Sequence, residues 1–462
     1  MSLRFGTDGV RGPAEELTDE LVSALGRAAA SVLGAGVDGS GFVIGRDPRS
    51  SGPRIEAALA RGLTAGGAIV EVLGVVPTPT IAWVCADRHV PGAVISASHN
   101  PFGDNGIKFF AAGGVKLTDA VEADLEAELD RVLAAAPPRD GDAPGTDAPD
   151  PGAPAAVAAD PTAVDDIERW CRSLLGSVEG RRLDGLHVVI DCANGSSSAI
   201  APDVLRRLGA SVDVLHAEPD GRNINDRCGS THPDDLQRAV VASGASVGLA
   251  FDGDADRVLA VDERGELVDG DHLIALCALD LRARGQLTDD AVVVTVMTNL
   301  GFRLAMVDHG IEVVETQVGD RYVLEALDKR GLALGGEQSG HVIFRRLATT
   351  GDGLLTGVQL LDLLVRARRP LSELAAEAMT RLPQVLVGVK VAKKDPRLVD
   401  ALAADIAAVE AELGERGRVL VRASGTEPLV RVMVEAPDEQ VARSAADRLA
   451  DAVSRHAAEL ST

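Results

Sequence analysis

The chain has 462 residues, enough for about three domains, and its composition of 46% hydrophobic and 25% charged residues allows several buried cores. Its formal net charge of −24 at pH 7 argues against nucleic acid and against an acidic membrane surface as partners. An anionic substrate would therefore need a local cluster of arginine and lysine that reverses the field.

No apolar run approaches the roughly 18 residues that a membrane span requires, and residues 1–5 lack a secretory h-region. We therefore expect a cytoplasmic protein without a membrane partner. The five cysteines are scattered, odd in number and never spaced as CxxC. This pattern favours buried free thiols over a disulfide framework or a thiolate zinc site.

The predicted elements alternate between amphipathic helices and short β-branched strands, the pattern of α/β units. Apolar residues recur at helical spacing from Leu21 to Leu33, and Gly34 follows as a stop. Strand-like runs that end in polar or glycine-rich loops occupy residues 92–95, 187–190, 247–251 and 291–295. Ligands of open α/β sheets gather at the carboxyl ends of strands, so we expect these loops to carry the chemistry.

Two segments mark domain boundaries. Residues 137–161 hold seven of the chain's 22 prolines and almost no large apolar residue, which predicts a flexible insertion. A second boundary is expected near residues 366–370. Strands are predicted beyond it at 385–391 and 429–434, with helices near 397–413 and 438–457, and these indicate a smaller α+β domain.

The motif DGDADR follows the apolar run at 247–251 and places Asp252, Asp254 and Asp256 at alternate positions. Three carboxylates that can aim at one point repel each other unless a cation lies between them. Oxygen ligands suit a hard divalent ion, and Mg²⁺ is the usual ion where phosphate is transferred. The alternatives are a solvated acidic turn and a fragment of a calcium loop, and the preceding strand argues against the latter.

The motif SASHNP follows the strand-like run at 92–95 and presents Ser98 beside His99, with Lys108 ten residues further on. A serine hydroxyl in such a loop can act as a nucleophile or carry phosphate if a base and a cation are close. A turn that merely terminates the strand is the alternative.

A third motif, RASGTEP, contains Ser424, Gly425 and Thr426 between Arg422 and Arg431. Two hydroxyls, free backbone N–H groups and two guanidinium groups can bind phosphate oxygens, which would provide the local positive cluster. An ordinary tight turn with solvated arginines is the alternative.

Two further loops are less specific. The motif GGEQSGH brings Glu337, Ser339 and His341 into one loop that could bind sugar hydroxyls, and FGTDGVRG brings Arg11 into a glycine-rich loop. A plain polar turn and a surface charge are their respective alternatives. Four other histidines fit no ligand spacing and receive no role; they are His187, His216, His232 and His272.

Together these residues resemble the α-D-phosphohexomutase family. The motifs that carry the resemblance follow the family's order along the whole chain: FGTDGVRG (5–12), ISASHNP (95–101), DNGIKFF (104–110), DCANG (191–195), DGDADR (252–257), VGDRYV (318–323), GEQSGH (336–341) and RASGTEPLVRVMVE (422–435). Gln338 in GEQSGH, together with FGTDG and DNGIKFF, favours the branch of the family that acts on glucosamine phosphate.

The resemblance implies an α/β fold with four domains around a central cleft, three of them related mixed α/β domains and the last a C-terminal α+β domain. The expected division is 1–136 with the phosphoserine loop, 137–161 as the flexible insertion, 162–260 with the metal loop, 261–370 with the sugar-binding loop and 371–462 with the phosphate-binding loop.

The resemblance also implies roles for the motif residues. Ser98 would be the phosphoserine, and one Mg²⁺ would be held by a phosphoserine oxygen and by Asp252, Asp254 and Asp256. The other expected roles are transfer of the phosphoryl group for Arg11, His99 and Lys108, sugar binding for Glu337 and Ser339 with His341 as proton acceptor, and anchoring of the non-reacting phosphate for Arg422, Ser424, Gly425, Thr426 and Arg431.

The implied activity is the interconversion of glucosamine 6-phosphate and glucosamine 1-phosphate through glucosamine 1,6-bisphosphate, ahead of UDP-N-acetylglucosamine and cell-wall synthesis. The expected partner is the small phosphosugar, with a homodimer as the alternative to a monomer. Competing hypotheses are a phosphoglucomutase/phosphomannomutase, a metal-dependent phosphatase and a non-catalytic phosphosugar-binding protein.

Overall fold

The computed structural model describes residues 9–34, 41–135, 161–393, 395, 397–423 and 428–460. The predicted insertion lies almost entirely outside these residues. The chain forms two compact units, one of Met1–Val296 with Val314–Ala375 and one of Met297–Val313 with Ala376–Thr462. No described helix is long and apolar enough to cross a membrane. The cysteines are free and buried, as the sequence predicted.

The first sheet of the larger unit has the strand order β1-β5-β4-β2-β3. Strand β2 runs parallel to β3 and β4, whereas β5 runs antiparallel to β4 and β1. Its elements are β1 (Val10–Pro13), α1 (Asp19–Leu33), β2 (Gly41–Arg46), α2 (Gly52–Ala65), β3 (Ile69–Val75), α3 (Thr78–Arg88), β4 (Gly92–Ile95), β5 (Asp104–Phe110) and α4 (Asp119–Ala134).

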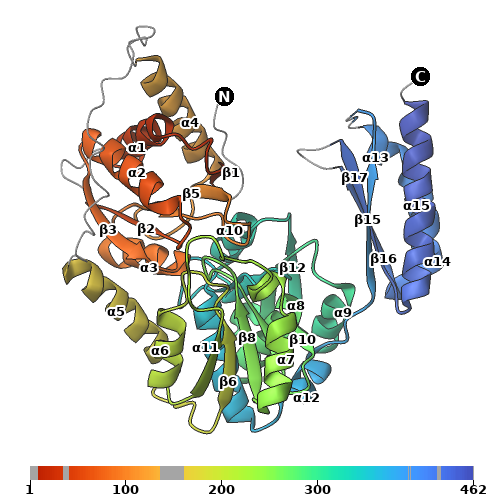
Figure 1. Ribbon diagram of the computed structural model, residues 1–462. Coiled ribbons are helices and arrows are strands. Elements are labelled where there is room, and N and C mark those ends of the chain that lie inside the picture. Colours follow the sequence, from red (N-terminus) through yellow and green to blue (C-terminus); the bar gives the residue numbers. More distant parts are fainter. Residues whose placement is uncertain are drawn as a thin grey trace. The chain divides into compact units, whose positions relative to one another are not determined.

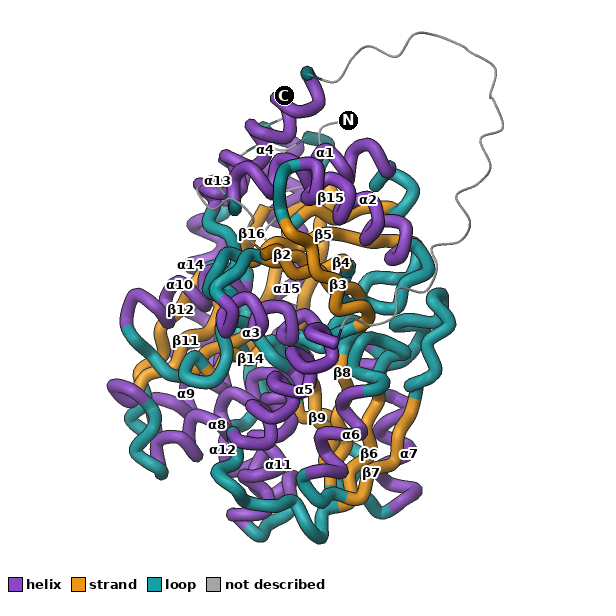
Figure 2. The backbone as a smooth tube through the Cα atoms, turned by 90° about the vertical axis from the view of Figure 1, so that its left-hand side faces the viewer, coloured by secondary structure: helices purple, strands orange, loops and turns teal. Residues whose placement is uncertain are grey.

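Alternate side chains of this sheet face two separate cores. Phe42 and Ile44 pack with α1, α2 and α4 on one face, and Val43 packs with α3 on the other. Figures 1 and 2 show the sheet between these helices. Because both faces are covered, the central strands β2 and β4 are built mainly of buried apolar residues.

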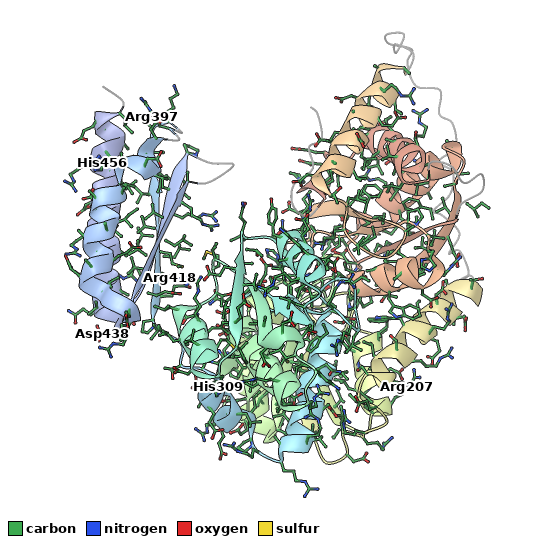
Figure 3. The ribbon with its side chains drawn as sticks, turned by 180° about the vertical axis from the view of Figure 1, so that it is seen from behind. Arg207, His309, Arg397, Arg418, Asp438 and His456 are labelled. Atoms are coloured by element: carbon green, nitrogen blue, oxygen red, sulfur yellow. The ribbon has the colours of Figure 1, made fainter. Side chains whose placement is uncertain are left out.

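The second sheet has the order β10-β9-β8-β6-β7, with β6, β7 and β8 parallel and β8 joined to β9 as a hairpin. The Arg207 side chain, labelled in Figure 3, donates to Glu168 and ties α6 to α5. The elements are α5 (Pro161–Gly176), β6 (His187–Asp191), α6 (Ile200–Arg207), β7 (Ser211–Leu215), a 3₁₀ turn (Gly229–Thr231), α7 (Asp234–Ser243), β8 (Val247–Phe251), β9 (Val258–Asp262) and β10 (Leu267–Val268).

The third sheet has the order β12-β11-β13-β14, and the antiparallel pair β13 and β14 encloses the loop 337–341. The elements of this region are α8 (Gly270–Ala283), a 3₁₀ turn (Thr288–Asp290), β11 (Ala291–Thr295), β12 (Glu312–Thr316), α10 (Asp320–Arg330), β13 (Leu334–Gly336), β14 (Val342–Phe344), α11 (Gly353–Ala367) and α12 (Leu371–Ala378).

Helix α11 begins at a buried carboxylate. Asp352 is the N-cap, and its Oδ1 accepts from the backbone N–H of Leu355 at 2.8 Å. Burial raises the pKa of Asp352 to about 7, although backbone N–H groups and Trp170 oppose the shift. The ordinary aspartate pKa, which applies to the unfolded chain, is 3.8, so the native state loses stability as the pH rises from about 4 to 7, and the loss is complete above that.

We therefore predict that Asp352→Asn raises the melting temperature more at pH 8 than at pH 5. The amide still accepts the Leu355 hydrogen bond, but it cannot become a buried charge. Thermal unfolding of both proteins at the two pH values checks this. An equal shift at both pH values would mean that Asp352 is ionised throughout.

The smaller unit contains an antiparallel sheet of order β15-β17-β16 with one apolar core against its helices. The His456 imidazole, labelled in Figure 3, lies 3.1 Å from Asp405 and joins α15 to α14. The elements are α9 (Leu300–Asp308), β15 (Gln384–Lys390), α13 (Arg397–Ala401), α14 (Ala403–Leu413), a 3₁₀ turn (Gly414–Arg416), β16 (Arg418–Ala423), β17 (Leu429–Glu435) and α15 (Glu439–Glu459).

Candidate active site

The loop between β8 and β9 gathers three buried aspartates. Asp252, Asp254 and Asp256 each bring a carboxylate oxygen within 4.8 Å of the others. Ala255 has a positive φ of 57°, which turns the loop so that alternate side chains point the same way. Burial and the two neighbouring carboxylates raise the pKa of Asp252 well above its ordinary value.

Lys108 of β5 balances part of this negative charge. Its Nζ donates to Asp254 Oδ2 at 2.8 Å and to Asp256 Oδ2 at 3.1 Å, and its side chain is almost fully buried. Burial alone would raise the pKa of Asp256, but Lys108, His341 and Arg257 together hold it well below its ordinary value. The Thr78 hydroxyl, in the first turn of α3, adds a 2.7 Å hydrogen bond to Asp254.

The aspartates fit a magnesium ion. The Oδ1 atoms of Asp254 and Asp256 are buried and accept no hydrogen bond from any described residue. Buried carboxylate oxygens without donors are costly, and a hard divalent cation with oxygen ligands removes that cost. The structure therefore contains a candidate acidic metal site at these residues.

Ser98 joins this cluster from the loop after β4. Its side chain is fully buried, and its Oγ donates to Asp252 Oδ2 at 2.5 Å. The Ser98 backbone has a positive φ of 51°, which is unusual for a residue with a side chain and implies that its surroundings hold it in place. The conformation points the hydroxyl at the carboxylates instead of at solvent.

The surroundings that hold Ser98 are two side chains that the sequence did not reveal. The fully buried Arg49 guanidinium donates to the carbonyl oxygens of Ser98 (2.9 Å) and Asn100 (2.8 Å), and also to those of Pro101 and Asp104. Asn225 donates to the same Ser98 and Asn100 carbonyls at 2.9 and 3.0 Å. The stretch Arg46-Asp47-Pro48-Arg49, which starts at the last residue of β2 and holds three charged side chains, is the signal for Arg49 in the sequence.

His99 is close to the serine and to two cations. Its Nδ1 lies 3.4 Å from Ser98 Oγ and 3.1 Å from Arg257 Nη1. Burial lowers the pKa of His99 to about 4, and the positive charges of Arg257 and Arg11 contribute to the shift. The imidazole is thus neutral at physiological pH, and both arginines act on the same small region.

The predicted sugar loop, residues 337–341, lies beside the metal loop. His341 is buried between Asp256 Oδ2, at 3.7 Å from Nδ1, and Asp320 Oδ2, at 3.4 Å from Nε2. Burial would lower the pKa of His341, but these two carboxylates raise it overall. Asp320 belongs to the motif VGDRYV, but no role was predicted for it from the sequence.

Polar atoms of this loop remain free to bind a ligand. The buried Gln338 Nε2 and Ser339 Oγ have no hydrogen-bond partner among the described residues. Glu337 accepts from the backbone N–H of Gly319 at 3.2 Å through one oxygen, and burial raises its pKa. Unpaired buried donors and acceptors of this kind suit the hydroxyl groups of a sugar.

The predicted phosphate loop belongs to the smaller unit. Arg422 of β16 lies directly opposite Arg431 of β17 in the antiparallel register. Burial and the charge of Arg431 lower the pKa of Arg422. Like charges at opposing positions destabilise a sheet, so the pair is suited to an anion placed between its guanidinium groups. Ser424, Gly425 and Thr426 lie outside the described residues.

The larger unit thus brings the motif residues into one cluster. Ser98, His99, Lys108, the three aspartates and His341 connect through short contacts, and Arg11 and Arg257 add positive charge there. Their segments are far apart in the sequence and are loops of all three sheets, with Lys108 on strand β5 itself. The sequence had assigned no role to Arg257, although it closes the motif DGDADR.

Comparison with known families identifies this arrangement. The chain matches the alpha/beta/alpha domains I, II and III and the C-terminal domain described as Phosphoglucomutase/phosphomannomutase, at residues 2–135, 164–265, 269–382 and 386–452. The chain belongs to the phosphohexomutase family. The resemblance seen in the sequence is thereby confirmed, and so are the α/β fold class and an isomerase that transfers a phosphoryl group.

Two relatives match this chain over nearly its whole length, and both are named phosphoglucosamine mutase. The chain is 51% identical to the phosphoglucosamine mutase of Moorella thermoacetica over 447 residues, which cover 95% of this chain and 96% of the relative. It is 52% identical to the phosphoglucosamine mutase of Frankia alni over 470 residues, 98% of each chain.

Solved structures share the fold at lower identity. A family protein from Burkholderia thailandensis has a TM-score of 0.76 at 24% identity, covering 97% of both chains. An Aspergillus fumigatus N-acetylphosphoglucosamine mutase, in complex with GlcNAc-6P and magnesium, has a TM-score of 0.70 at 20% identity and covers 99% of this chain and 96% of its own.

Proposed function

We propose that the chain interconverts glucosamine 6-phosphate and glucosamine 1-phosphate through a phosphorylated Ser98 and a glucosamine 1,6-bisphosphate intermediate. One observation carries the proposal: the Ser98 hydroxyl is built into the carboxylate cluster, 2.5 Å from Asp252. Binding alone needs no buried hydroxyl at a metal site, and the names of the relatives support glucosamine as the sugar.

The reaction has two transfers that share one site. Phospho-Ser98 gives its phosphoryl group to O1 of glucosamine 6-phosphate, and the attacking hydroxyl loses its proton. The bisphosphate then turns over, and its 6-phosphate returns a phosphoryl group to Ser98. Bonds and charge balance over the cycle, because one O–P bond forms for each that breaks. Such transfer asks the protein mainly for positioning and for positive charge.

The residues present can meet the charge requirement. Lys108, Arg11 and Arg257 surround the position of the phosphoryl group, and Arg49 and Asn225 fix the backbone that carries it. When bound by Asp252, Asp254 and Asp256, Mg²⁺ would supply further positive charge at the phosphoryl oxygens.

The sugar and the second phosphate are assigned to other groups. We place the sugar hydroxyls at Glu337 and Ser339, with His341 as proton acceptor because Asp256 and Asp320 stabilise its charged form. Arg422, Ser424, Gly425, Thr426 and Arg431 are proposed to hold the phosphate that does not react.

The domain division expected from the sequence is part of the proposal. The four matched family domains span 2–135, 164–265, 269–382 and 386–452, which supports the boundaries expected at 136 and 162 but lies later in the chain than those expected at 261 and 371. We place the reaction in the cytoplasm, where its product would enter amino-sugar nucleotide synthesis.

Initial rates on glucosamine 6-phosphate, glucose 6-phosphate and mannose 6-phosphate test the substrate. With Mg²⁺ and protein phosphorylated at Ser98, we expect a preference of tenfold or more for glucosamine, about 1.4 kcal/mol of transition-state binding. A higher rate with glucose or mannose phosphate would transfer the proposal to phosphoglucomutase/phosphomannomutase. Steady release of inorganic phosphate from the sugar would instead favour the phosphatase hypothesis.

The arginine pair gives a separate prediction. Arg431→Gln should raise KM for glucosamine 6-phosphate about 10–100-fold, because a charged hydrogen bond to phosphate contributes about 1.5–3 kcal/mol. The same change should leave the melting temperature equal or higher, since the charge opposite Arg422 is removed. KM and thermal unfolding are measured together, with Arg443→Gln on the exposed face of α15 as control. A lower melting temperature with an unchanged KM would assign the pair a purely structural role.

A further inference from the structure

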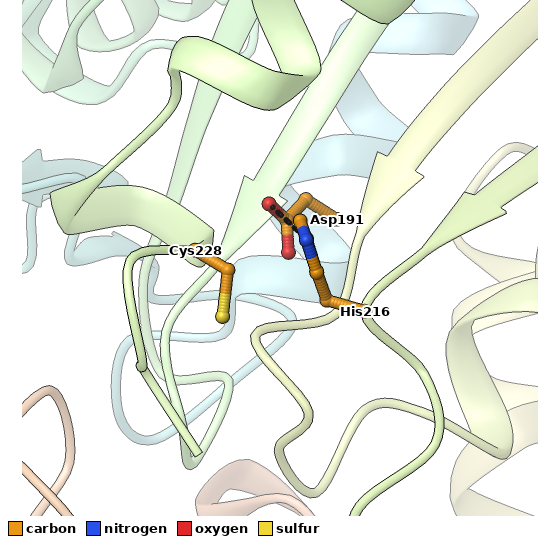
Figure 4. Close-up of side chains that lie close together, drawn as sticks. All are labelled: Asp191, His216 and Cys228. Carbon is orange, nitrogen blue, oxygen red and sulfur yellow. Dashed lines mark hydrogen bonds and ion pairs between the residues drawn. The ribbon is translucent and has the colours of Figure 1, made fainter. Parts of the chain in front are cut away.

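A second cluster of side chains lies outside this site, at the carboxyl ends of β6 and β7. Asp191 is the last residue of β6, His216 follows β7, and Cys228 precedes the 3₁₀ turn at Gly229–Thr231. Each offers one ligand atom, and these atoms lie within 4.8 Å of one another (Figure 4). Asp191 and Cys228 are buried, whereas the His216 side chain is 28% exposed and leaves a route to solvent.

The three donor atoms differ from those of the aspartate cluster. A carboxylate oxygen, an imidazole nitrogen and a thiol sulfur suit a borderline divalent ion such as Zn²⁺ or Co²⁺, and sulfur is a poor ligand for Mg²⁺. Three protein ligands also leave a fourth tetrahedral position for water. The chemistry of the set therefore selects a class of ion that the proposed reaction does not use.

The imidazole is oriented as a ligand would be. His216 Nδ1 lies 3.0 Å from Asp191 Oδ2, inside the cluster, and its Nε2 lies 3.5 Å from Asp235 Oδ2 on the other side. A carboxylate on the outer nitrogen of a metal-bound histidine fixes the ring and its tautomer. Asp191 is held as well, because its Oδ1 accepts from the backbone N–H of Ala193 at 2.9 Å.

Cys228 is the least constrained of the three side chains. Its side chain is fully buried, and its hydrogen bond with Asn194 is weak, because Nδ2 lies 4.0 Å from Sγ. Ligands on a tetrahedral zinc ion with bonds of about 2.0–2.3 Å stand roughly 3.3–3.8 Å apart. The three ligand atoms lie within 4.8 Å of one another, so they need to approach by no more than about 1–1.5 Å to reach this spacing.

We propose that Asp191, His216 and Cys228 form a binding site for one thiophilic divalent metal ion. The ion takes the place of the proton between His216 and Asp191, and the thiol gives up its proton to bind as a thiolate. The site is independent of the proposed mutase activity.

The test is a Co²⁺ titration of the full chain with excess Mg²⁺ present to occupy the aspartates. Thiolate ligation gives a near-ultraviolet charge-transfer band, which we expect to saturate at one equivalent. Cys228→Ala should abolish the band, and His216→Asn should weaken binding at least tenfold; asparagine tolerates the positive φ of 47° at this position. Cys277→Ala, which removes a buried thiol of α8, and Asp256→Asn should both keep the band.

Two results would overturn the proposal: no thiolate band in the unmodified protein, or a band of full strength in Cys228→Ala. If Cys228→Ala does not fold, the His216→Asn variant decides the question. Undiminished Co²⁺ affinity in that variant would show that the imidazole is not a ligand and would also overturn the proposal.

Discussion

Ser98→Ala is expected to abolish turnover of glucosamine 6-phosphate, with a loss of roughly a thousandfold or more. This variant lacks the hydroxyl that would carry the phosphoryl group. Transfer to water instead would release inorganic phosphate, and no phosphoryl group would remain for the second transfer. Phosphorylation of the protein by glucosamine 1,6-bisphosphate, followed by mass spectrometry, should fall to background in parallel with the rate.

The loss should come with little change in stability. Alanine and serine meet the same backbone strain at φ 51°, so the change removes the side-chain hydrogen bond to Asp252, of about 1 kcal/mol, and the longer contact with His99. Ser243→Ala, at the end of α7, is the matched control and should retain full activity. Full activity in purified Ser98→Ala protein would refute the phosphoserine, whatever the fate of the metal site.

The sequence predicted the fold well where strands are buried on both faces. The runs at 92–95, 187–190, 247–251 and 291–295 lie in β4, β6, β8 and β11, because a short apolar run closed by a polar loop is typical of a buried strand. Strand β16 was not predicted, since its residues Arg418–Ala423 alternate weakly and end in the polar motif. The two compact units of the structure were also not evident, because residues 297–313 pack with a segment far along the chain.

The candidate site was predicted where one motif holds the chemistry. The three aspartates stand at alternate positions of one motif, so the sequence already placed them near one another. Arg49 and Asn225 could not be found in this way, because they bind backbone carbonyl oxygens. Every residue has such an oxygen, so the sequence does not show which side chains will contact it. His216 fits no ligand spacing in sequence for a similar reason: its neighbours Asp191 and Cys228 come from separate loops that only the sheet aligns.

Lys108→Met is the second change for which we expect a large effect. Without metal, the ammonium is the charge that lies within 3.1 Å of both Asp254 and Asp256. Removing one partner of a buried ion pair leaves the others uncompensated and costs about 3–5 kcal/mol of unfolding free energy. Activity should fall at least about 100-fold as well, since a positive group beside the transferred phosphoryl is lost. Denaturant unfolding in EDTA measures the first effect, and initial rates measure the second.

The decisive comparison is the response to Mg²⁺. If Lys108 and the metal neutralise the same carboxylates, Mg²⁺ should raise the melting temperature of Lys108→Met by more than it raises that of the unmodified protein. In a double-mutant cycle with Asp254→Asn, the cost of Lys108→Met should shrink, because one of the two charges that the lysine offsets is gone. Additive costs together with an equal Mg²⁺ response would show that Lys108 is independent of the metal site. If Mg²⁺ instead stabilises Lys108→Met more than it stabilises the unmodified protein, Lys108 and the metal neutralise the same carboxylates. The lysine would then explain how a chain of net charge −24 keeps three carboxylates buried before any ion binds.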